Sequence, residues 1–249
     1  MPREHGAYAQ LAFPLLSGLI LGAPPWPGYA LAAAAVLLFL AYEPLVVLLG
    51  VRGARLQQEE SAAARRQLPV LAAAGLILAG AALLGLPAPA RLLVLVPLAA
   101  AGLLLPLVPT RRVKTLAGET LVAAALSSMH LPIAAAGGAQ GVRLWGPPLV
   151  WFAGFFLATL AVHAIKARQK QRDRWLPVTA VGAAAAGLAL AVALFLAVPS
   201  LRLLAVALAL PIAAVLAVNL KRVHPRQLKR VGWTLVAADS ATLVLLAFL

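Results

Sequence analysis

Apolar residues in this chain come in runs of about 17–24 residues, separated by short stretches rich in Arg, Lys, Pro or Gly. A helix needs roughly 20 apolar residues to cross about 30 Å of hydrocarbon. No stretch alternates apolar and polar positions with the period of two that a membrane β-barrel requires. The pattern therefore predicts an all-α polytopic membrane protein with nine transmembrane helices. Their expected bounds are 7–23, 28–50, 68–86, 89–109, 116–137, 146–166, 177–198, 201–220 and 231–249.

The composition agrees with this pattern. Of the 249 residues, 63% are hydrophobic and only 11% are charged, and the mean hydropathy is +0.96. A soluble domain of this size would need more polar residues to cover its core. We therefore expect one transmembrane domain over residues 1–249. The chain contains no cysteine, which excludes disulfides and thiolate metal sites.

The formal net charge of +14 would suggest a nucleic-acid partner in a soluble protein. Here its distribution indicates orientation instead. With nine spans, eighteen Lys and Arg residues fall on the side of the N-terminus and three on the other, namely Arg91, Arg143 and Arg202. The positive-inside rule then places the N-terminus in the cytoplasm and the C-terminus outside it, in a bacterial inner membrane. We expect membrane lipids as partners, and no nucleic acid.

Two local features complete the expected architecture. The longest polar stretch, residues 52–67, predicts a short interfacial helix. Prolines inside the spans predict kinks; they stand at positions 14, 44, 97, 132 and 211. The charge pattern alone is equally compatible with a cleaved signal peptide at the first span.

Ionisable side chains inside a membrane are costly, so each is a functional hypothesis by default. The spans contain Glu43, Glu119, His130, His163 and Asp239, with Glu4 and His5 at the first interface. By the rise of a helix, all except His130 fall in the cytoplasmic half, and His130 approaches the middle. The sequence thus predicts a polar cavity that opens to the cytoplasm below an almost purely apolar outer half.

Helical spacing refines this cavity. Thr159, His163, Lys166 and Lys170 share one face of the expected sixth span. Together with Glu119, an imidazole and an ammonium group on this face would suit a phosphate or a metal–phosphate. The plain alternatives are that the lysines extend to lipid headgroups and that Glu119 interacts with its own helix dipole.

Glu43 and Asp239 have plain alternatives as well. Glu43 precedes Pro44 within a span, where an ion pair with an arginine of a neighbouring helix would account for it. Asp239 lies beside Ser240 in a similar position. The chain contains no Walker loop, no His-Glu-x-x-His, no Gly-x-Ser-x-Gly and no dinucleotide fingerprint.

The N-terminal residues carry a more specific signal. Residues 2–8 read Pro-Arg-Glu-His-Gly-Ala-Tyr and continue into Leu-Ala-Phe-Pro-Leu-Leu-Ser-Gly at 11–18. This string resembles the opening of the YwiC-like family of bacterial membrane proteins. The resemblance implies that the first span is retained, because the signature lies within it.

A wider similarity is to the UbiA superfamily of intramembrane prenyltransferases. It is carried by Arg3, Pro14 and Gly18 in the first span, by residues 115–119 (Thr-Leu-Ala-Gly-Glu), and by residues 175–178 (Trp-Leu-Pro-Val). The resemblance implies nine helices in a UbiA-like bundle and a cytoplasmic N-terminus. It also implies one cavity on which Arg3, Glu4, His5, Glu119, His163 and Lys166 converge, where Glu119 or Glu43 would pair with Lys166 or Arg3 in the absence of ligand.

The aspartate motifs of that superfamily are missing. The first region contains Glu43 alone and the second contains Asp173 alone, whereas magnesium needs several oxygen ligands. We therefore expect no metal and no cofactor. The basic residues that stand there instead can bind phosphate directly.

The leading hypothesis is a pocket for an anionic amphiphile, such as a prenyl diphosphate or a phospholipid. Its expected ligand-binding residues are Arg3, Glu4, His5, Glu43, Glu119, His163, Lys166 and Asp239. One alternative is a divergent prenyltransferase that uses Glu43, Glu119, Asp173 or His163. The other is a small transporter or an accessory subunit of a membrane complex, although no internal repeat typical of transporters is evident.

Overall fold

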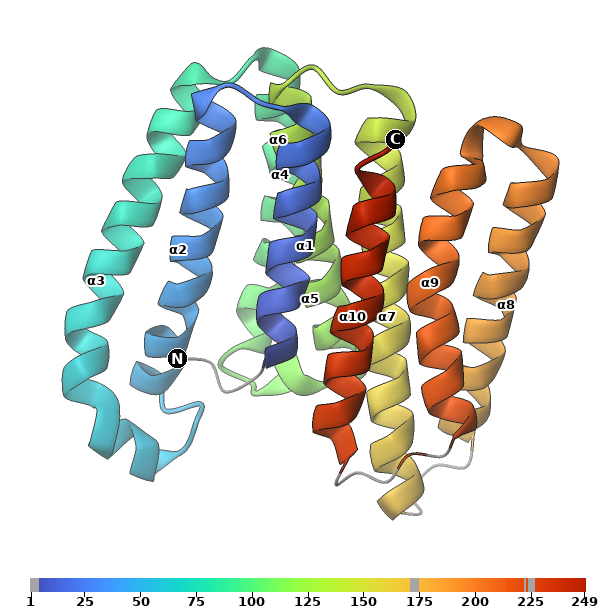
Figure 1. Ribbon diagram of the computed structural model, residues 1–249. Coiled ribbons are helices and arrows are strands. Elements are labelled where there is room, and N and C mark those ends of the chain that lie inside the picture. Colours follow the sequence, from blue (N-terminus) through green and yellow to red (C-terminus); the bar gives the residue numbers. More distant parts are fainter. Residues whose placement is uncertain (1–4, 171–174, 222, 224–226) are drawn as a thin grey trace.

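The computed structural model describes residues 5–170, 175–221, 223 and 227–249, leaving aside the side chains of His5 and Lys170. All regular structure in this part of the chain is helical (Figure 1). The α-helices are α1 (His5–Gly22), α2 (Trp26–Leu48), α3 (Ala54–Gly85), α4 (Ala88–Leu104), α5 (Leu116–Ser128), α6 (His130–Ala136), α7 (Gly141–Lys170), α8 (Trp175–Ala197), α9 (Arg202–Leu220) and α10 (Leu228–Leu246). Three single turns of 3₁₀ helix lie at Leu105–Leu107, Arg112–Lys114 and Pro199–Leu201.

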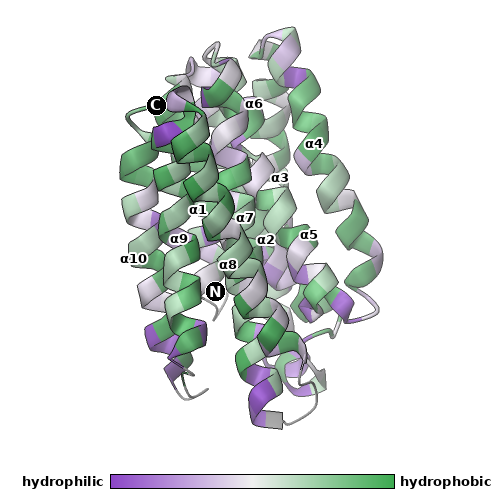
Figure 2. Ribbon diagram, turned by 90° about the vertical axis from the view of Figure 1, so that its right-hand side faces the viewer, coloured by the Kyte–Doolittle hydropathy of each residue, from purple (hydrophilic) through white to green (hydrophobic). Residues whose placement is uncertain are grey.

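The helices run alternately up and down through one bundle, with α5 and α6 in line as one broken rod (Figure 1). The α2–α3 turn, the last turns of α7 and α9 and the first turns of α8 and α10 lie at the same end, and hydrophilic residues gather there (Figure 2). We call this the basic end, defined by the loops 49–53 and 105–115, the C-terminal turns of α7 and α9, and the N-terminal turns of α5 and α10. The opposite end, which holds the connections 23–25, 86–87 and 137–140, is the apolar end.

Within the described part of the chain, seven helical segments are long and apolar enough to cross a membrane, namely Trp26–Leu48, Ala54–Gly85, Ala88–Leu107, Leu116–Ala136, Gly141–Gln169, Trp175–Ala197 and Pro199–Leu220. The apolar helix Gly6–Gly22 is shorter. Helix α10 has 19 residues but includes Lys229, Arg230 and Asp239. The structure therefore supports a multi-pass membrane protein, while the count of nine spans stays a prediction.

The prediction of a separate interfacial helix at residues 52–67 is wrong. This segment is helical, but it continues directly into the next span as α3, which has 32 residues. By the helical rise, α3 is about 48 Å long. Its first turns consist mainly of Ala, Arg, Gln and Glu, which are strong helix formers, so nothing ends the helix before the apolar part begins.

The expected kink sites behave in two ways. Pro14, Pro44, Pro97 and Pro211 lie inside uninterrupted helices. At Pro132 the rod breaks, because α5 ends at Ser128 and α6 begins at His130. Proline has no N–H to offer the carbonyl four residues earlier. At the end of α5 the Met129 amide bonds to the Leu126 carbonyl oxygen, three residues earlier, at 3.2 Å. This spacing is that of a 3₁₀ turn and is tighter than the four-residue spacing of an α-helix.

Close packing joins α1, α6 and α7 into one unit. Gly22 and Gly137 face each other so closely that a Cβ on Gly137 would collide with the carbonyl oxygen of Gly22. The rings of Phe13 and Trp151 stack with centroids 5.4 Å apart and bind α1 to α7. Small residues allow such close approach of helices in lipid, where burial from water drives little association.

A second unit joins α7, α9 and α10. Pro211 leaves the Ala207 carbonyl without its helical donor, and the Thr242 hydroxyl of α10 lies 3.3 Å from that oxygen. A Cβ on Gly154 of α7 would lie 3.2 Å from the Pro211 ring, so α7 approaches α9 at this level. These contacts hold α7, α9 and α10 together.

Candidate functional site

The first turn of α5 holds Glu119 in a fixed position at the basic end. The Thr115 hydroxyl oxygen caps the helix by accepting a hydrogen bond from the Gly118 amide at 3.2 Å. A Cβ on Gly118 would lie 2.6 Å from the Arg112 carbonyl oxygen, so the preceding 3₁₀ turn packs directly on the helix start. Only glycine fits there, which explains the residue before Glu119.

His163, near the end of α7, meets this carboxylate. Its Nε2 lies 3.0 Å from Glu119 Oε2. A carboxylate only accepts, so the imidazole Nε2 carries the hydrogen and donates it. The two side chains are 20% and 33% exposed. The pair is therefore partly screened from solvent but still reachable from the basic end. Among the expected site residues that the structure describes, these are the two that it joins by a hydrogen bond.

The other basic group expected at this position points outward. Lys166, one turn beyond His163, is exposed and forms no ion pair with any described residue. The expected pairing of Glu119 with Lys166 is therefore wrong, because His163 takes the carboxylate instead. His163 and Lys166 are three residues apart and so occupy neighbouring positions on one face of α7, but no ion pair joins Lys166 to a described carboxylate.

Glu43 belongs to a different part of the basic end. Its Oε2 accepts a hydrogen bond from Arg52 of the α2–α3 turn at 2.7 Å, and the two side chains are 15% and 27% exposed. The expected pairing of Glu43 with Lys166 is thus wrong as well. An arginine nine residues later in the chain accounts for this partly buried carboxylate, much as the plain alternative supposed, although Arg52 comes from a turn rather than a neighbouring helix.

Asp239 is also separate from the Glu119–His163 pair. It is buried in α10, which packs against α1 and α9, and no described cation lies within 4.0 Å of its carboxylate. Arg3, Glu4 and Asp173 lie outside the described residues. The side chain of His5 is likewise outside them, although its backbone begins α1.

A polar cluster that the sequence did not predict lies toward the apolar end. His130 Nε2 is 2.9 Å from the Arg143 carbonyl oxygen, so this nitrogen carries a hydrogen. His130 Nδ1 is 2.9 Å from the Ser17 hydroxyl, which also accepts the Trp151 indole N–H at 3.0 Å. All three side chains are fully buried. The half away from the basic end therefore contains a buried polar cluster that joins three helices.

Sequence reasoning saw His130 but neither of its partners. Ser17 and Trp151 are common residues in apolar helices, and they are 113 and 21 residues away along the chain. His130 also lies closer to the apolar end than expected, since it bonds to the first turn of α7. The cluster joins α1, α6 and α7 at the break between α5 and α6.

The described carboxylates do not suit the magnesium that the UbiA resemblance would bring. Mg²⁺ requires several oxygen ligands around one point. Glu43 and Glu119 lie in separate pairs, each with a nitrogen partner. No group of three or more His, Asp or Glu residues within the described ranges could hold a metal ion.

Comparison with known proteins identifies the family. Residues 1–135 match the YwiC-like protein family, so the match covers more than half of the chain and extends from α1 into α6. The chain belongs to the YwiC-like protein family. No curated protein and no solved structure matches it. The matched part includes Glu43, Glu119 and His130, whereas His163 and Lys166 lie beyond it.

Proposed function

We propose that this protein binds an anionic amphiphile, an isoprenoid diphosphate or a phospholipid, at its basic end. In this proposal it is a nine-span, UbiA-like protein of the bacterial inner membrane with a cytoplasmic N-terminus. Membership of the YwiC-like family and seven apolar helices of membrane length support the membrane setting. The asymmetric distribution of Lys and Arg supports the orientation.

The observation that carries the proposal is the hydrogen bond between Glu119 and His163 with Lys166 unpaired beside it. The imidazole hydrogen bond holds the carboxylate, so the Lys166 ammonium has no partner among the described carboxylates. A phosphate group would make charge-assisted hydrogen bonds with such an ammonium. An apolar tail on the same ligand would remain in the hydrocarbon beside α5 and α7, whose middle turns are apolar.

The remaining expected residues take different roles in this proposal. Arg3, Glu4 and His5 come just before or at the start of α1 in the sequence, and in this proposal they contribute charge to ligand binding. Glu43 has its own arginine, and Asp239 is buried within the bundle, so both act through the packing of their helices rather than by touching the ligand.

Native mass spectrometry of the purified protein with farnesyl diphosphate tests the proposal. We expect binding that persists in EDTA, and Lys166→Ala should weaken it by roughly fivefold, the effect of losing about 1 kcal/mol of attraction. Arg55→Ala is the matched control, because Arg55 is an exposed cation of the same end that already pairs with Glu59. Equal affinity in all three proteins would refute the proposal.

The same pair favours a second candidate, a divergent prenyltransferase. An imidazole oriented by a carboxylate is a common arrangement for a general base. If the protein is such an enzyme, it should release diphosphate from a prenyl diphosphate when an acceptor is supplied, and His163→Ala should lose that activity. Strict magnesium dependence of binding itself would place this candidate ahead of the first.

A further inference from the structure

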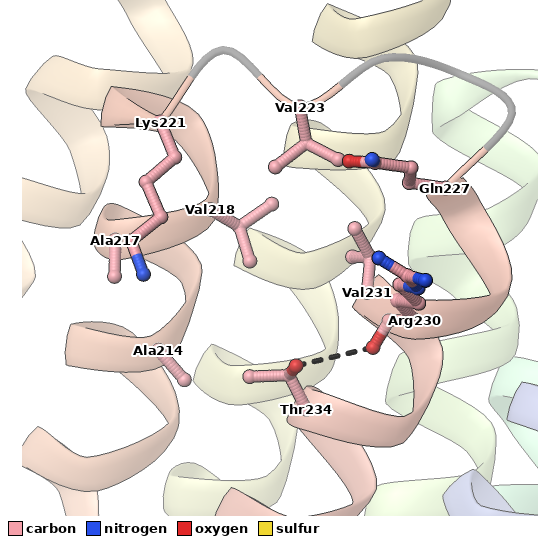
Figure 3. A pocket seen from close by; sticks show the side chains of 9 residues that line it. All are labelled: Ala214, Ala217, Val218, Lys221, Val223, Gln227, Arg230, Val231 and Thr234. Atoms are coloured by element: carbon pink, nitrogen blue, oxygen red, sulfur yellow. Dashed lines mark hydrogen bonds between the residues drawn. The ribbon is translucent and has the colours of Figure 1, made fainter.

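A groove of about 280 Å³ lies between the end of α9 and the start of α10, at the basic end (Figure 3). Its deeper part is apolar, with Ala214 and Ala217 on α9 and Val231 on α10. Its rim carries Lys221, which directly follows α9, and Arg230 of α10, so cations from the facing ends of two helices border the same space. The groove thus combines a charged mouth with an apolar interior.

The polar groups of the groove are mainly donors. Lys221, Arg230 and the amide of Gln227 present N–H groups. The Thr234 hydroxyl uses its hydrogen on the Arg230 carbonyl oxygen, at 3.1 Å. No carboxylate of the described residues lies within 4.0 Å of Lys221 or Arg230. Donors of this kind in one place suit an anion with several acceptor oxygens.

The direction of Lys221 supports this assignment. A lysine at the end of a membrane helix usually extends toward water and the headgroup layer. In Figure 3 the Lys221 side chain instead runs back along α9, and its amino group lies beside Ala217. Lys221 and Ala217 both line the groove, so the ammonium group is available to a phosphate at the mouth of the groove.

The groove is separate from the Glu119–His163 pair. Ile165 of α7 packs with Val218 and Val231 behind the groove. His163, two residues earlier, lies on the other side of α7 and contacts α5. Arg168 further binds α7 to α9 through the Asn219 carbonyl oxygen at 3.1 Å. Helix α7 thus stands between the two places, and they can be tested independently.

We propose that this groove binds the headgroup of an anionic glycerophospholipid, with the phosphate between Lys221 and Arg230 and the start of an acyl chain over Ala214 and Ala217. The apolar interior distinguishes a lipid from free phosphate, because a free ion would gain nothing from it. Trp233 is largely exposed within one turn of Arg230, and tryptophan prefers the interfacial layer in which lipid headgroups lie. The groove is a lipid site additional to the one proposed at α5 and α7.

Native mass spectrometry in detergent, with phosphatidylglycerol and phosphatidylcholine added separately, tests this site. We expect one phosphatidylglycerol to bind in preference to phosphatidylcholine. The double variant Lys221→Ala/Arg230→Ala should weaken that binding by roughly 25-fold, since each surface cation contributes about fivefold. Lys229→Ala is the matched control, because Lys229 is exposed on the same turn but does not line the groove.

Further variants separate the possible sources of the signal. Lys221→Arg/Arg230→Lys keeps both charges and should retain phosphatidylglycerol, which guards against misfolding as the cause of loss. Ala214→Leu fills the apolar interior and should weaken phosphatidylglycerol binding. Lys166→Ala should leave it unchanged, so that failure here and failure of the α5–α7 site give different results.

Three outcomes would overturn the proposal. The first is phosphatidylglycerol binding that survives the double alanine substitution. The second is equal binding of phosphatidylcholine, which would show an apolar groove without preference for an anion. The third is that glycerol 1-phosphate binds as tightly as phosphatidylglycerol and that Ala214→Leu leaves its affinity unchanged. This result would identify a site for soluble phosphates.

Discussion

His163 of α7 donates a hydrogen bond to the carboxylate of Glu119 in α5 across 3.0 Å. The two residues are 44 positions apart in the chain, and their contact connects the neighbouring helices α5 and α7 at the basic end. Both side chains are partly exposed. The contact therefore has two consequences, one for stability and one for what can reach the carboxylate.

The stability consequence can be measured with a double-mutant cycle. We expect Glu119→Ala and His163→Ala each to lower the unfolding free energy in mixed micelles, with a coupling energy of about 1–2 kcal/mol, because a hydrogen bond to a charged group contributes about that much. The pair Arg55 and Glu59 on the exposed side of α3 is the control, and its coupling should stay below about 0.5 kcal/mol. Equal coupling in the two cycles would contradict a structural role for the Glu119–His163 contact.

Topology is the next expectation, and it follows from the asymmetric placement of Lys and Arg. Reporter fusions after Arg55, Arg112 and Arg168 should report the cytoplasm, and a fusion after Leu249 should report the periplasm. The polar character of α10 makes the last fusion decisive, because α10 is not among the seven segments of clear membrane length and apolarity. A cytoplasmic signal at Leu249 would reduce the count of spans to an even number.

The positions of most helices could be predicted from the sequence because membrane helices consist of long apolar runs. The span expected at 177–198 is Trp175–Ala197 in the structure, and the one expected at 201–220 corresponds to Arg202–Leu220. The bounds failed at α3, where helix formers extend the apolar run without a break. The hydropathy of a segment indicates whether it can lie in lipid, whereas the ends of its helix depend on the helix propensity of the residues there.

The candidate site followed only in part, for a related reason. Helical depth was enough to place Glu119 and His163 at one level, and they do meet. Depth does not say which way a helix is turned, so it could not assign Glu43 to Arg52. It also could not bring Ser17 and Trp151 to His130, because that meeting depends on how α1 and α7 pack.

The buried cluster around His130 should matter for stability. Ser17→Ala removes the group that meets both His130 Nδ1 and the Trp151 indole N–H. We expect a loss of about 1–3 kcal/mol in the unfolding free energy, the usual cost of leaving buried polar groups without partners. Ser128→Ala is the control, since the Ser128 hydroxyl bonds only to Ala125 of its own helix and should cost less than about 0.5 kcal/mol. If both substitutions cost the same, the cluster does not hold the three helices together.

The approach of α1 to α6 gives the last prediction. A Cβ on Gly137 would collide with the Gly22 carbonyl oxygen, and a Cβ on Gly22 would lie 2.7 Å from the Ala134 Cα. Both obstacles are backbone atoms, which cannot rotate away as the end of a flexible side chain could. Gly137→Ala should therefore push α1 from α6 and lower the unfolding free energy by at least about 2 kcal/mol.

The control for this prediction is Gly182→Ala in α8. A Cβ there would meet nothing within 4 Å, so the substitution should be neutral or should stabilise the helix by about 0.5–1 kcal/mol, the gain expected from replacing glycine in a helix interior. Denaturation in mixed micelles compares the two variants under one condition. Because α1 carries Ser17 and α6 begins at His130, separating these helices should also break the buried cluster and quench or shift the Trp151 fluorescence. A Gly137→Ala protein as stable as Gly182→Ala, with unchanged fluorescence, would show that α1 and α6 do not pack as closely as their glycines indicate.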